Sequence, residues 1–390
     1  METTELPTQI ELVHRASQLA PVMTEHAGWN EENRRVHDTV VEALTDAGMF
    51  RLRVPAANGG YESDATTMVA VATELAKADA SAAWTVAVNW ITTWMAALFP
   101  PEVRDEVFAD ASLRMCGTLS PSATAAPVDG GFLVNGKWGF VSGAPHSQWQ
   151  VLVAMAPGPG GDPWPVMALA PLSDLLVVDD WHTSGLRGSG SVTTVADNVF
   201  VPAARVVPLV SALPDGYASG RTGIYGAPLV ATAAASVTGL AVGMARAAID
   251  QFRQRMQERG ITYTSYASQA AAPVTHLKLA DAVVRADEAE FHAQRLARQT
   301  DTKNAAADPW TIEDRARARV DMGRACRLAQ ESVNILRRAS GGSSIYTNVP
   351  IQQIARDIDA MNMHALMQPE TNLELYGRVL SGLEPDTLYL

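Results

Sequence analysis

The sequence predicts an α+β protein in which helices and strands occupy separate blocks of the chain. Apolar residues recur at helical spacing through residues 6–110, and short β-branched runs broken by Gly, Pro, Asp and Ser fill 113–205. Long alanine-rich segments follow from about 226. We therefore divide the chain into an N-terminal helical domain (1–112), a middle β-domain (113–212) and a C-terminal helical bundle (213–390).

Composition argues against several classes of protein. The 390 residues are 47% hydrophobic and 18% charged, which is ample for a large core. A net charge of −12 argues against nucleic acid and anionic membranes as partners. No apolar run reaches the roughly 18 residues of a membrane span, and the N-terminus lacks the pattern of a signal peptide. Two distant cysteines fit a reducing cytoplasm better than a disulfide framework or a zinc site.

The N-terminal block contains one segment that we expect to be a buried helix. Asp64 is expected to cap the helix that follows it along the chain. Residues 80–99 are unusually apolar and carry Trp84, Trp90 and Trp94, so a helix there would be hydrophobic on every face.

The later blocks have signals of their own. The segment FLVNGKWGFVSG places Asn135-Gly136 between two strand-like pieces, which is the strongest short hairpin signal. Beyond a polar link at 208–223, the spacing suits an antiparallel bundle with helices at roughly 226–259, 268–301, 309–340, 350–362 and 369–380.

A Gly-rich turn, G-L-R-G-S-G-S, offers groups that bind anions. It carries the cation Arg187, the hydroxyls of Ser189 and Ser191, and backbone amides freed by Gly188 and Gly190. Glycine lets a backbone approach an anion closely, and successive amides in a turn form an anion-binding nest. The alternative is a tight turn whose arginine faces water.

This turn, followed by D-N-V-F-V-P, resembles the middle-domain signature of the acyl-CoA dehydrogenase superfamily. It resembles more closely the flavin-dependent monooxygenases that share the fold, and the match continues in order along nearly the whole chain. The resemblance implies an N-terminal helical domain, a middle β-barrel or sandwich and a C-terminal four-helix bundle, assembled as a homotetramer.

The same resemblance implies the oxygenase component of a two-component system. Such a protein takes reduced FAD or FMN from a separate NAD(P)H:flavin reductase. It uses O₂, through a flavin C(4a)-hydroperoxide, to hydroxylate an aromatic or heteroaromatic small molecule, including natural-product or steroid-like substrates. The absence of a Rossmann G-x-G-x-x-G fingerprint from the sequence agrees with reduction by a partner.

Ser142 is the first expected catalytic residue. N-G-K-W-G-F-V-S-G resembles the strand that ends in W-S-S-G in the monooxygenases, where the last hydroxyl bonds the central-ring nitrogen of the flavin. Ser142 falls on that position, and Phe140 is also assigned to the flavin site. The role of Ser142 would be to hold and shield the hydroperoxide from water. The alternative is a serine that closes a hairpin.

The loop before this strand keeps only the position of a family motif. Thr118, Leu119 and Ser120 stand where the dehydrogenases have T-E-P-G-A-G-S-D, and the Gly-Ser-Asp portion is missing. We expect flavin contacts from these three residues, with an ordinary loop as the alternative. The loss of the motif weakens the hypothesis that the substrate is an acyl-CoA.

His364 is the second expected catalytic residue. R-D-I-D-A-M-N-M-H-A-L-M-Q-P-E resembles a monooxygenase segment whose second His lies over the flavin, and Asp359 stands where that segment has its first His. A neutral imidazole there can accept a substrate proton or form a hydrogen bond. The dehydrogenases need a carboxylate base beside this position, and no Glu is present. A structural histidine is the alternative.

Trp84, Thr92 and Trp94 are assigned to the substrate. Their helix resembles the substrate-facing helix of the hydroxylases, in which Thr92 replaces a His that contacts phenols. We therefore expect a larger or more apolar substrate than a simple phenol. The alternative is tryptophans that pack a core, which is preferred for Trp90.

Gly341 and Gly342 resemble the glycine pair that lets a neighbouring subunit's flavin tail approach. A helix C-cap is the alternative. The R-x-x-F motif that holds the FAD tail in dehydrogenases is missing from 254–268, so the sequence does not choose between FMN and FAD. The other functions left open are an acyl-CoA dehydrogenase or oxidase, an N- or S-oxygenase of the same fold, and a non-catalytic flavin-binding or scaffold protein.

Overall fold

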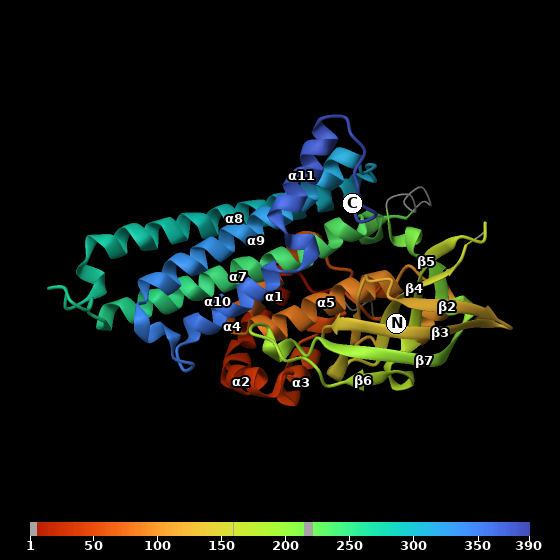
Figure 1. Cartoon of the computed structure of the whole chain (residues 1–390), viewed down its shortest axis with the longest axis horizontal. Helices are drawn as coiled ribbons and strands as arrows, with labels where there is room; N and C mark the ends of the chain where they lie inside the picture. Colours follow the sequence, from red (N-terminus) through yellow and green to blue (C-terminus); the bar gives the residue numbers. More distant parts are fainter. Residues whose placement is uncertain (1–5, 159, 214–220) are drawn as a thin grey trace.

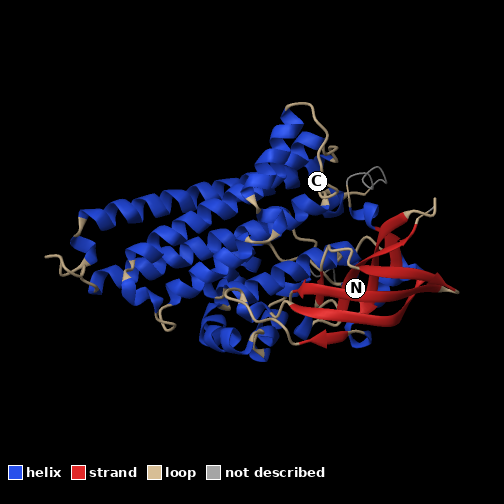
Figure 2. Ribbon diagram, in the orientation of Figure 1, coloured by secondary structure: helices blue, strands red, loops and turns tan. Residues whose placement is uncertain are grey.

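The structure is a computed structural model that describes residues 6–158, 160–213 and 221–390. A helical bundle runs along the long axis, and a β-sheet lies at one end (Figures 1 and 2). The N-terminal helices are α1 (Gln9–Gln18), α2 (Ala20–Asn33), α3 (Asp38–Asp46), α4 (Ala65–Ala78), α5 (Ala80–Ala96) and α6 (Pro101–Val107). The strands are β1 (Met115–Gly117), β2 (Ala123–Val128), β3 (Gly131–Val141), β4 (Trp149–Pro157), β5 (Pro163–Pro171), β6 (Leu176–Val178), β7 (Val192–Pro202) and β8 (Val206–Pro208). The C-terminal helices are α7 (Leu229–Glu258), α8 (Pro273–Ala306), α9 (Ile312–Ala339), α10 (Pro350–Asn362) and α11 (Pro369–Leu380).

Helix α5 is the element that joins the bundle to the sheet. It contacts α4 and α7 on one side and strands β1 and β4 on the other. Nearly all of its residues are buried, as its apolar sequence predicts, and Trp90 donates its indole N–H to the Met49 carbonyl at 2.6 Å. The predicted cap at Asp64 is also confirmed, because its carboxylate accepts from the Thr67 amide at 2.8 Å.

The sheet has eight strands in the order β6-β7-β3-β2-β4-β5-β8, with β1 pairing in parallel with β4. The predicted hairpin turn at Asn135-Gly136 is wrong, because both residues lie inside β3. The turn is at Asp129-Gly130, where Val128 pairs with Gly131 and Gly130 has φ +78°.

Two contacts explain why the Asn-Gly pair does not turn. A Cβ built on Gly136 would lie 2.5 Å from the Ala123 Cβ, so glycine is required by the close approach of β2. The Asn135 carboxamide oxygen accepts from the Asn198 amide on β7 at 2.8 Å. The pair therefore forms an irregularity within the sheet instead of ending a strand.

The bundle helices lie close to their predicted ranges. Helix α8 begins five residues later than predicted because Pro273 occupies its first turn. Helix α7 is long and apolar enough to span a membrane, but 94% of that stretch is buried inside the protein. Gly239 explains part of this burial, since a Cβ there would lie 2.3 Å from the Val69 carbonyl of α4. The predicted polar link at 208–223 lies partly outside the described residues.

One apolar core spans both helical blocks. It includes Leu12 of α1, Leu75 of α4, Leu240 of α7 and Leu336 of α9, while the sheet has a separate core around Trp138. The N-terminal helices therefore pack on the bundle as one layered unit. The division at 112 and 212 stays a prediction about domain boundaries.

Candidate active site

Five of the sequence-predicted site residues come together where the sheet meets the helices. Trp84 lies on α5, Ser142 follows β3, and Ser189 and Ser191 lie in and after the short 3₁₀ helix η5 (Arg187–Ser189). His364 immediately precedes the 3₁₀ helix η12 (Ala365–Met367). These positions are far apart in the chain, so the fold itself builds the cluster.

The serine hydroxyls form one hydrogen-bonded chain. Trp84 donates its Nε1–H to Ser142 Oγ at 2.9 Å, and Ser142 Oγ lies 2.7 Å from Ser191 Oγ. Ser191 Oγ lies 2.7 Å from Ser189 Oγ, which donates to the Leu186 carbonyl at 2.7 Å. All three serines are buried. Ser142 is therefore part of an ordered polar network and does more than close a turn.

His364 lies beside this network with an accessible face. Its ring centroid is 6.1 Å from that of Trp84, and the planes are tilted by 60°. Its Nδ1 accepts from the Leu366 amide at 3.3 Å, which assigns the proton of the neutral ring to Nε2. The surrounding protein removes water from the ring and lowers the pKa of His364. A neutral imidazole that carries its proton on Nε2 can donate a hydrogen bond to a bound molecule.

Phe140 presents an aromatic ring to the surface two residues before Ser142. Its side chain is 75% exposed, and its ring packs edge-on against Trp181 at 5.8 Å. Its φ of +61° is rare for a bulky residue and costs of order 1–3 kcal/mol. Strained backbone of this kind clusters at functional sites, and the exposed ring fits the flat apolar face of a flavin.

Arg187 forms its hydrogen bonds with backbone carbonyls that are not part of this cluster. Its Nε donates to the Glu31 carbonyl and its Nη1 to the Thr183 carbonyl, both at 3.0 Å. A Cβ on Gly188 would lie 2.8 Å from the Asn30 Cβ, so the glycine serves packing of the turn on α2. These contacts fit neither of the two expectations for this turn, an open anion-binding nest or a tight turn whose arginine faces water. Contact of Arg187 with a flavin stays a prediction.

Thr92 and Trp94 do not join Trp84. Thr92 Oγ1 lies 3.2 Å from the Met115 carbonyl of β1, and Trp94 donates to the Ile224 carbonyl at 3.1 Å from within a core cluster. Trp94 is ten residues from Trp84, which is about 15 Å along a helix. These contacts favour the packing alternative for both residues.

The predicted flavin loop is anchored by the end of the chain. Leu119, between Thr118 and Ser120, accepts at its carbonyl from the Tyr389 hydroxyl at 2.7 Å. Arg319 of α9 in turn donates to the Tyr389 carbonyl at 2.6 Å. The loop is therefore tied to the bundle, and its flavin contacts stay a prediction.

The glycine pair follows α9 and has open space around it. Gly341 follows Ser340, the C-cap of α9, and has φ +73° with ψ −177°; no atom lies within 4 Å of a Cβ built on either glycine. Next to the pair, Arg255 and Arg259 both donate to Ser343 Oγ, at 2.8 and 2.5 Å. Within the described residues, no carboxylate forms an ion pair with either arginine. Two converging guanidinium groups on one hydroxyl favour an anion.

Two residues of the site were not predicted from the sequence. Asp357 of α10 is buried, and its Oδ1 accepts from the Leu186 amide at 2.7 Å. Burial raises the pKa of Asp357 to about 7. Leu186 has φ +48°, the left-handed region. The available signal was the R-D pair in the His364 segment, to which we assigned no role.

Comparison with known proteins identifies the chain. The acyl-CoA dehydrogenase N-terminal domain family matches residues 11–107, and the acyl-CoA dehydrogenase C-terminal domain family matches residues 235–369. A pigment production hydroxylase from Rhodococcus sp. (strain ATCC 21145) is 30% identical and aligns over 95% of this chain and 96% of its own length. The oxygenase component of the FADH(2)-dependent resorcinol hydroxylase from Rhizobium sp. (strain MTP-10005) is 29% identical, with coverages of 97% and 96%.

Solved structures agree with these relatives. XiaF from Streptomyces sp., in complex with FADH2 and glycerol, superposes with a TM-score of 0.94 at 29% identity and covers 98% of both chains. The HsaA monooxygenase from M. tuberculosis superposes with a TM-score of 0.90 at 29% identity. The match covers 98% of this chain and 100% of that one. The chain therefore belongs to the acyl-CoA dehydrogenase family and has its fold. Within that family it belongs with the oxygenase components of two-component flavin-dependent hydroxylases, which confirms the predicted class.

Proposed function

We propose that this protein binds a reduced flavin against Phe140 and Ser142 and uses it with O₂ to hydroxylate an aromatic or heteroaromatic small molecule. The observation that supports this most directly is the Trp84–Ser142 hydrogen bond with His364 beside it. Bound there, the reduced flavin would supply the activated oxygen, while the protein supplies position and a water-poor surrounding.

The residues at the site fit a flavin ring. Ser142 offers its hydroxyl oxygen to the central-ring nitrogen, and Phe140 offers an exposed aromatic face next to it. We assign His364 the role of hydrogen-bond donor to flavin or substrate, because its Nδ1 is occupied by the Leu366 amide.

FADH2 is the proposed flavin, with FMN as the alternative. Two relatives are named or solved with FADH2, and the open space beside Gly341 and Gly342 leaves room for a second molecule's flavin tail. The paired Arg255 and Arg259 would bind the phosphates of that tail. The reduced flavin would come from a separate NAD(P)H:flavin reductase, as in two-component systems.

The proposed substrate carries an aromatic ring larger or more apolar than a simple phenol. The relatives include enzymes named for resorcinol, p-hydroxyphenylacetate and indole-3-acetate, all of which are aromatic. Thr92 cannot replace a substrate-binding histidine here, since its hydroxyl is within bonding distance of backbone carbonyls. Exposed Met363, next to His364, adds an apolar surface at the same place.

We further propose that the protein is a cytoplasmic homotetramer. Both cysteines are buried and unpaired, which suits a reducing compartment. Leu277, Val284 and Phe291 recur every seven residues on α8, and each is more than half exposed. Such a stripe is typical of a helix that packs on another helix.

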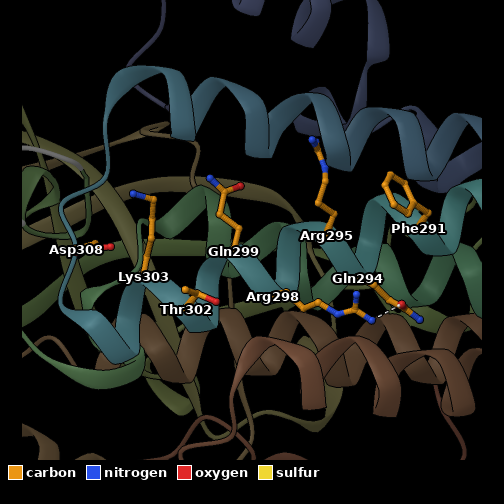
Figure 3. A pocket seen from close by; sticks show the side chains of 8 residues that line it. All are labelled: Phe291, Gln294, Arg295, Arg298, Gln299, Thr302, Lys303 and Asp308. Atoms are coloured by element: carbon orange, nitrogen blue, oxygen red, sulfur yellow. Dashed lines mark hydrogen bonds between the residues drawn. The ribbon is translucent and has the colours of Figure 1, made fainter.

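Beside that stripe is a hollow of about 480 Å³ on the surface of α8 (Figure 3). Its lining carries three cations, Arg295, Arg298 and Lys303, against one acid, Asp308. Substituting Leu277 and Phe291 with Asp should lower the molar mass measured by light scattering. The same change at exposed Leu373 of α11 is the control.

Replacing single site residues tests the proposed activity. Ser142→Ala and His364→Ala should each lower product formation with reduced flavin and leave the circular dichroism unchanged. Ser147→Ala is the control, because its hydroxyl donates to the Gly143 carbonyl of the preceding turn and is not one of the hydroxyls in the Ser142–Ser191–Ser189 chain. Unchanged product yield in both site variants would refute the assignment.

A further inference from the structure

The hydrogen-bonded chain of serine hydroxyls ends in one group that can only donate and one group that can only accept. At one end, the indole N–H of Trp84 is a donor and cannot accept. At the other end, the backbone carbonyl of Leu186 is an acceptor and cannot donate. Each serine between them has a single proton to give.

These ends determine the direction of every proton in the chain. Ser189 must give its proton to the Leu186 carbonyl, since the two oxygens are 2.7 Å apart. The 2.7 Å contact between Ser189 and Ser191 then requires the proton of Ser191. The 2.7 Å contact between Ser191 and Ser142 requires the proton of Ser142. The opposite direction would place the Leu186 carbonyl against a lone pair, at a distance that only a hydrogen bond permits.

Ser142 is consequently left as an acceptor. It gives its proton to Ser191 and receives the indole proton of Trp84, so one lone pair on its oxygen stays available. No proton remains with which Ser142 could donate to a bound molecule.

The acceptor at the end of the chain is itself held in place. The Leu186 amide donates to Asp357 at 2.7 Å, and Trp181 donates its indole N–H to the Leu186 carbonyl at 3.0 Å. These two bonds stabilise Leu186 in its left-handed conformation and fix the direction in which its carbonyl points.

We propose that Ser189 and Ser191 are positioning residues, which orient the Ser142 hydroxyl as a hydrogen-bond acceptor and so favour reduced over oxidised flavin. The central-ring nitrogen of a reduced flavin carries a proton and can donate to Ser142. The same nitrogen of an oxidised flavin has only a lone pair, which would face the lone pair of Ser142. This inference rests on the proposed function, because it requires a flavin at Ser142. The sequence predicted that Ser189 and Ser191 contact the flavin directly. In this inference they act on the flavin through Ser142 instead.

Anaerobic binding of both redox states of FAD and FMN tests this. The readout is the ratio of the dissociation constant of the oxidised flavin to that of the reduced flavin. In Ser191→Ala, the proton of Ser142 loses its acceptor and can turn toward the flavin, so we expect the ratio to fall about tenfold. Ser189→Ala should act in the same direction, because Ser191 can then donate back to Ser142. Ser147→Ala should leave the ratio unchanged.

The outcomes separate this inference from the proposed function. An unchanged ratio in both variants would overturn the inference while the wild-type protein still binds reduced flavin. An equal weakening of both redox states would also overturn it, because that is the result of a general structural loss. Failure of the wild-type protein to bind either flavin in its reduced state would contradict the proposed function itself.

Discussion

The indole nitrogen of Trp84 lies 2.9 Å from the hydroxyl oxygen of Ser142 and joins α5 to the end of β3. Replacing Trp84 with Phe removes this donor and keeps most of the ring. We expect several-fold less product for each reduced flavin consumed, since a hydrogen bond of this kind is worth about 1 kcal/mol. The measurement is product formed against hydrogen peroxide released.

Trp94 provides the matched control on the same helix. Its indole donates to the Ile224 carbonyl at 3.1 Å, so Trp94→Phe also removes one buried hydrogen bond. Equal losses of product in the two variants would mean that Trp84 acts through the stability of α5 and not through Ser142.

The ionisation of Asp357 should make stability depend on pH. Burial raises its pKa to about 7, with Asp79 and Glu31 adding to the rise and the Leu186 amide and Arg356 opposing it. A carboxyl whose folded pKa exceeds its unfolded value contributes stability below the unfolded value, near pH 4, that is lost as the pH rises through 7.

Asp357→Asn removes that dependence because the amide does not ionise and its oxygen can still accept from Leu186. The Tm of the variant minus that of the wild type should therefore increase between pH 5 and pH 8. The corresponding change in free energy of unfolding is roughly 2 kcal/mol. A difference that stays constant over this range would contradict the assigned pKa.

The close approach of β2 to β3 should make Gly136 intolerant of a side chain. In Gly136→Ala the new Cβ would lie 2.5 Å from the Ala123 Cβ, and the residue would have φ +153°. We expect a loss of roughly 2–4 kcal/mol in the free energy of unfolding by urea. Gly139→Ala in the same strand has its nearest contact at 3.7 Å and should change stability by less than about 1 kcal/mol. Similar losses in both would show that the β2–β3 contact is not tight.

The sequence predicted most helices and missed the hairpin for a physical reason. Helix ranges follow from the periodicity of apolar residues, which is local information. The role of Asn135-Gly136 depends on Ala123 and Asn198, which approach only when three strands pair. The strongest local turn signal was therefore overridden by tertiary contacts.

The candidate site was predictable to a similar extent. Resemblance located Ser142 and His364, because both lie in short motifs. The Asp357–Leu186 bond joins residues 171 positions apart and has no motif of its own. The packing of Thr92 and Trp94 against β1 and Ile224 was equally invisible, since helical spacing alone does not say what an apolar face meets.

Arg259 should distinguish the two candidate flavins. It donates to Ser343 Oγ beside the glycine pair, where we propose that the tail of a neighbour's FAD lies. In Arg259→Ala, the affinity for reduced FAD should fall several-fold, while that for reduced FMN should change less because FMN lacks the adenylate half. Exposed Arg253 of α7, the helix that ends just before Arg259, is the control, and equal losses for both flavins would contradict this placement.

The most direct test of the central claim is stopped-flow spectroscopy of the protein, premixed with reduced FAD or FMN, against oxygenated buffer. The account predicts that oxidised flavin appears in a slow phase, after an earlier absorbing species that persists in wild type and is shortened in Ser142→Ala. Reoxidation in one phase at the rate of free flavin, in wild type and variant alike, would contradict the assignment as a flavin-dependent hydroxylase component.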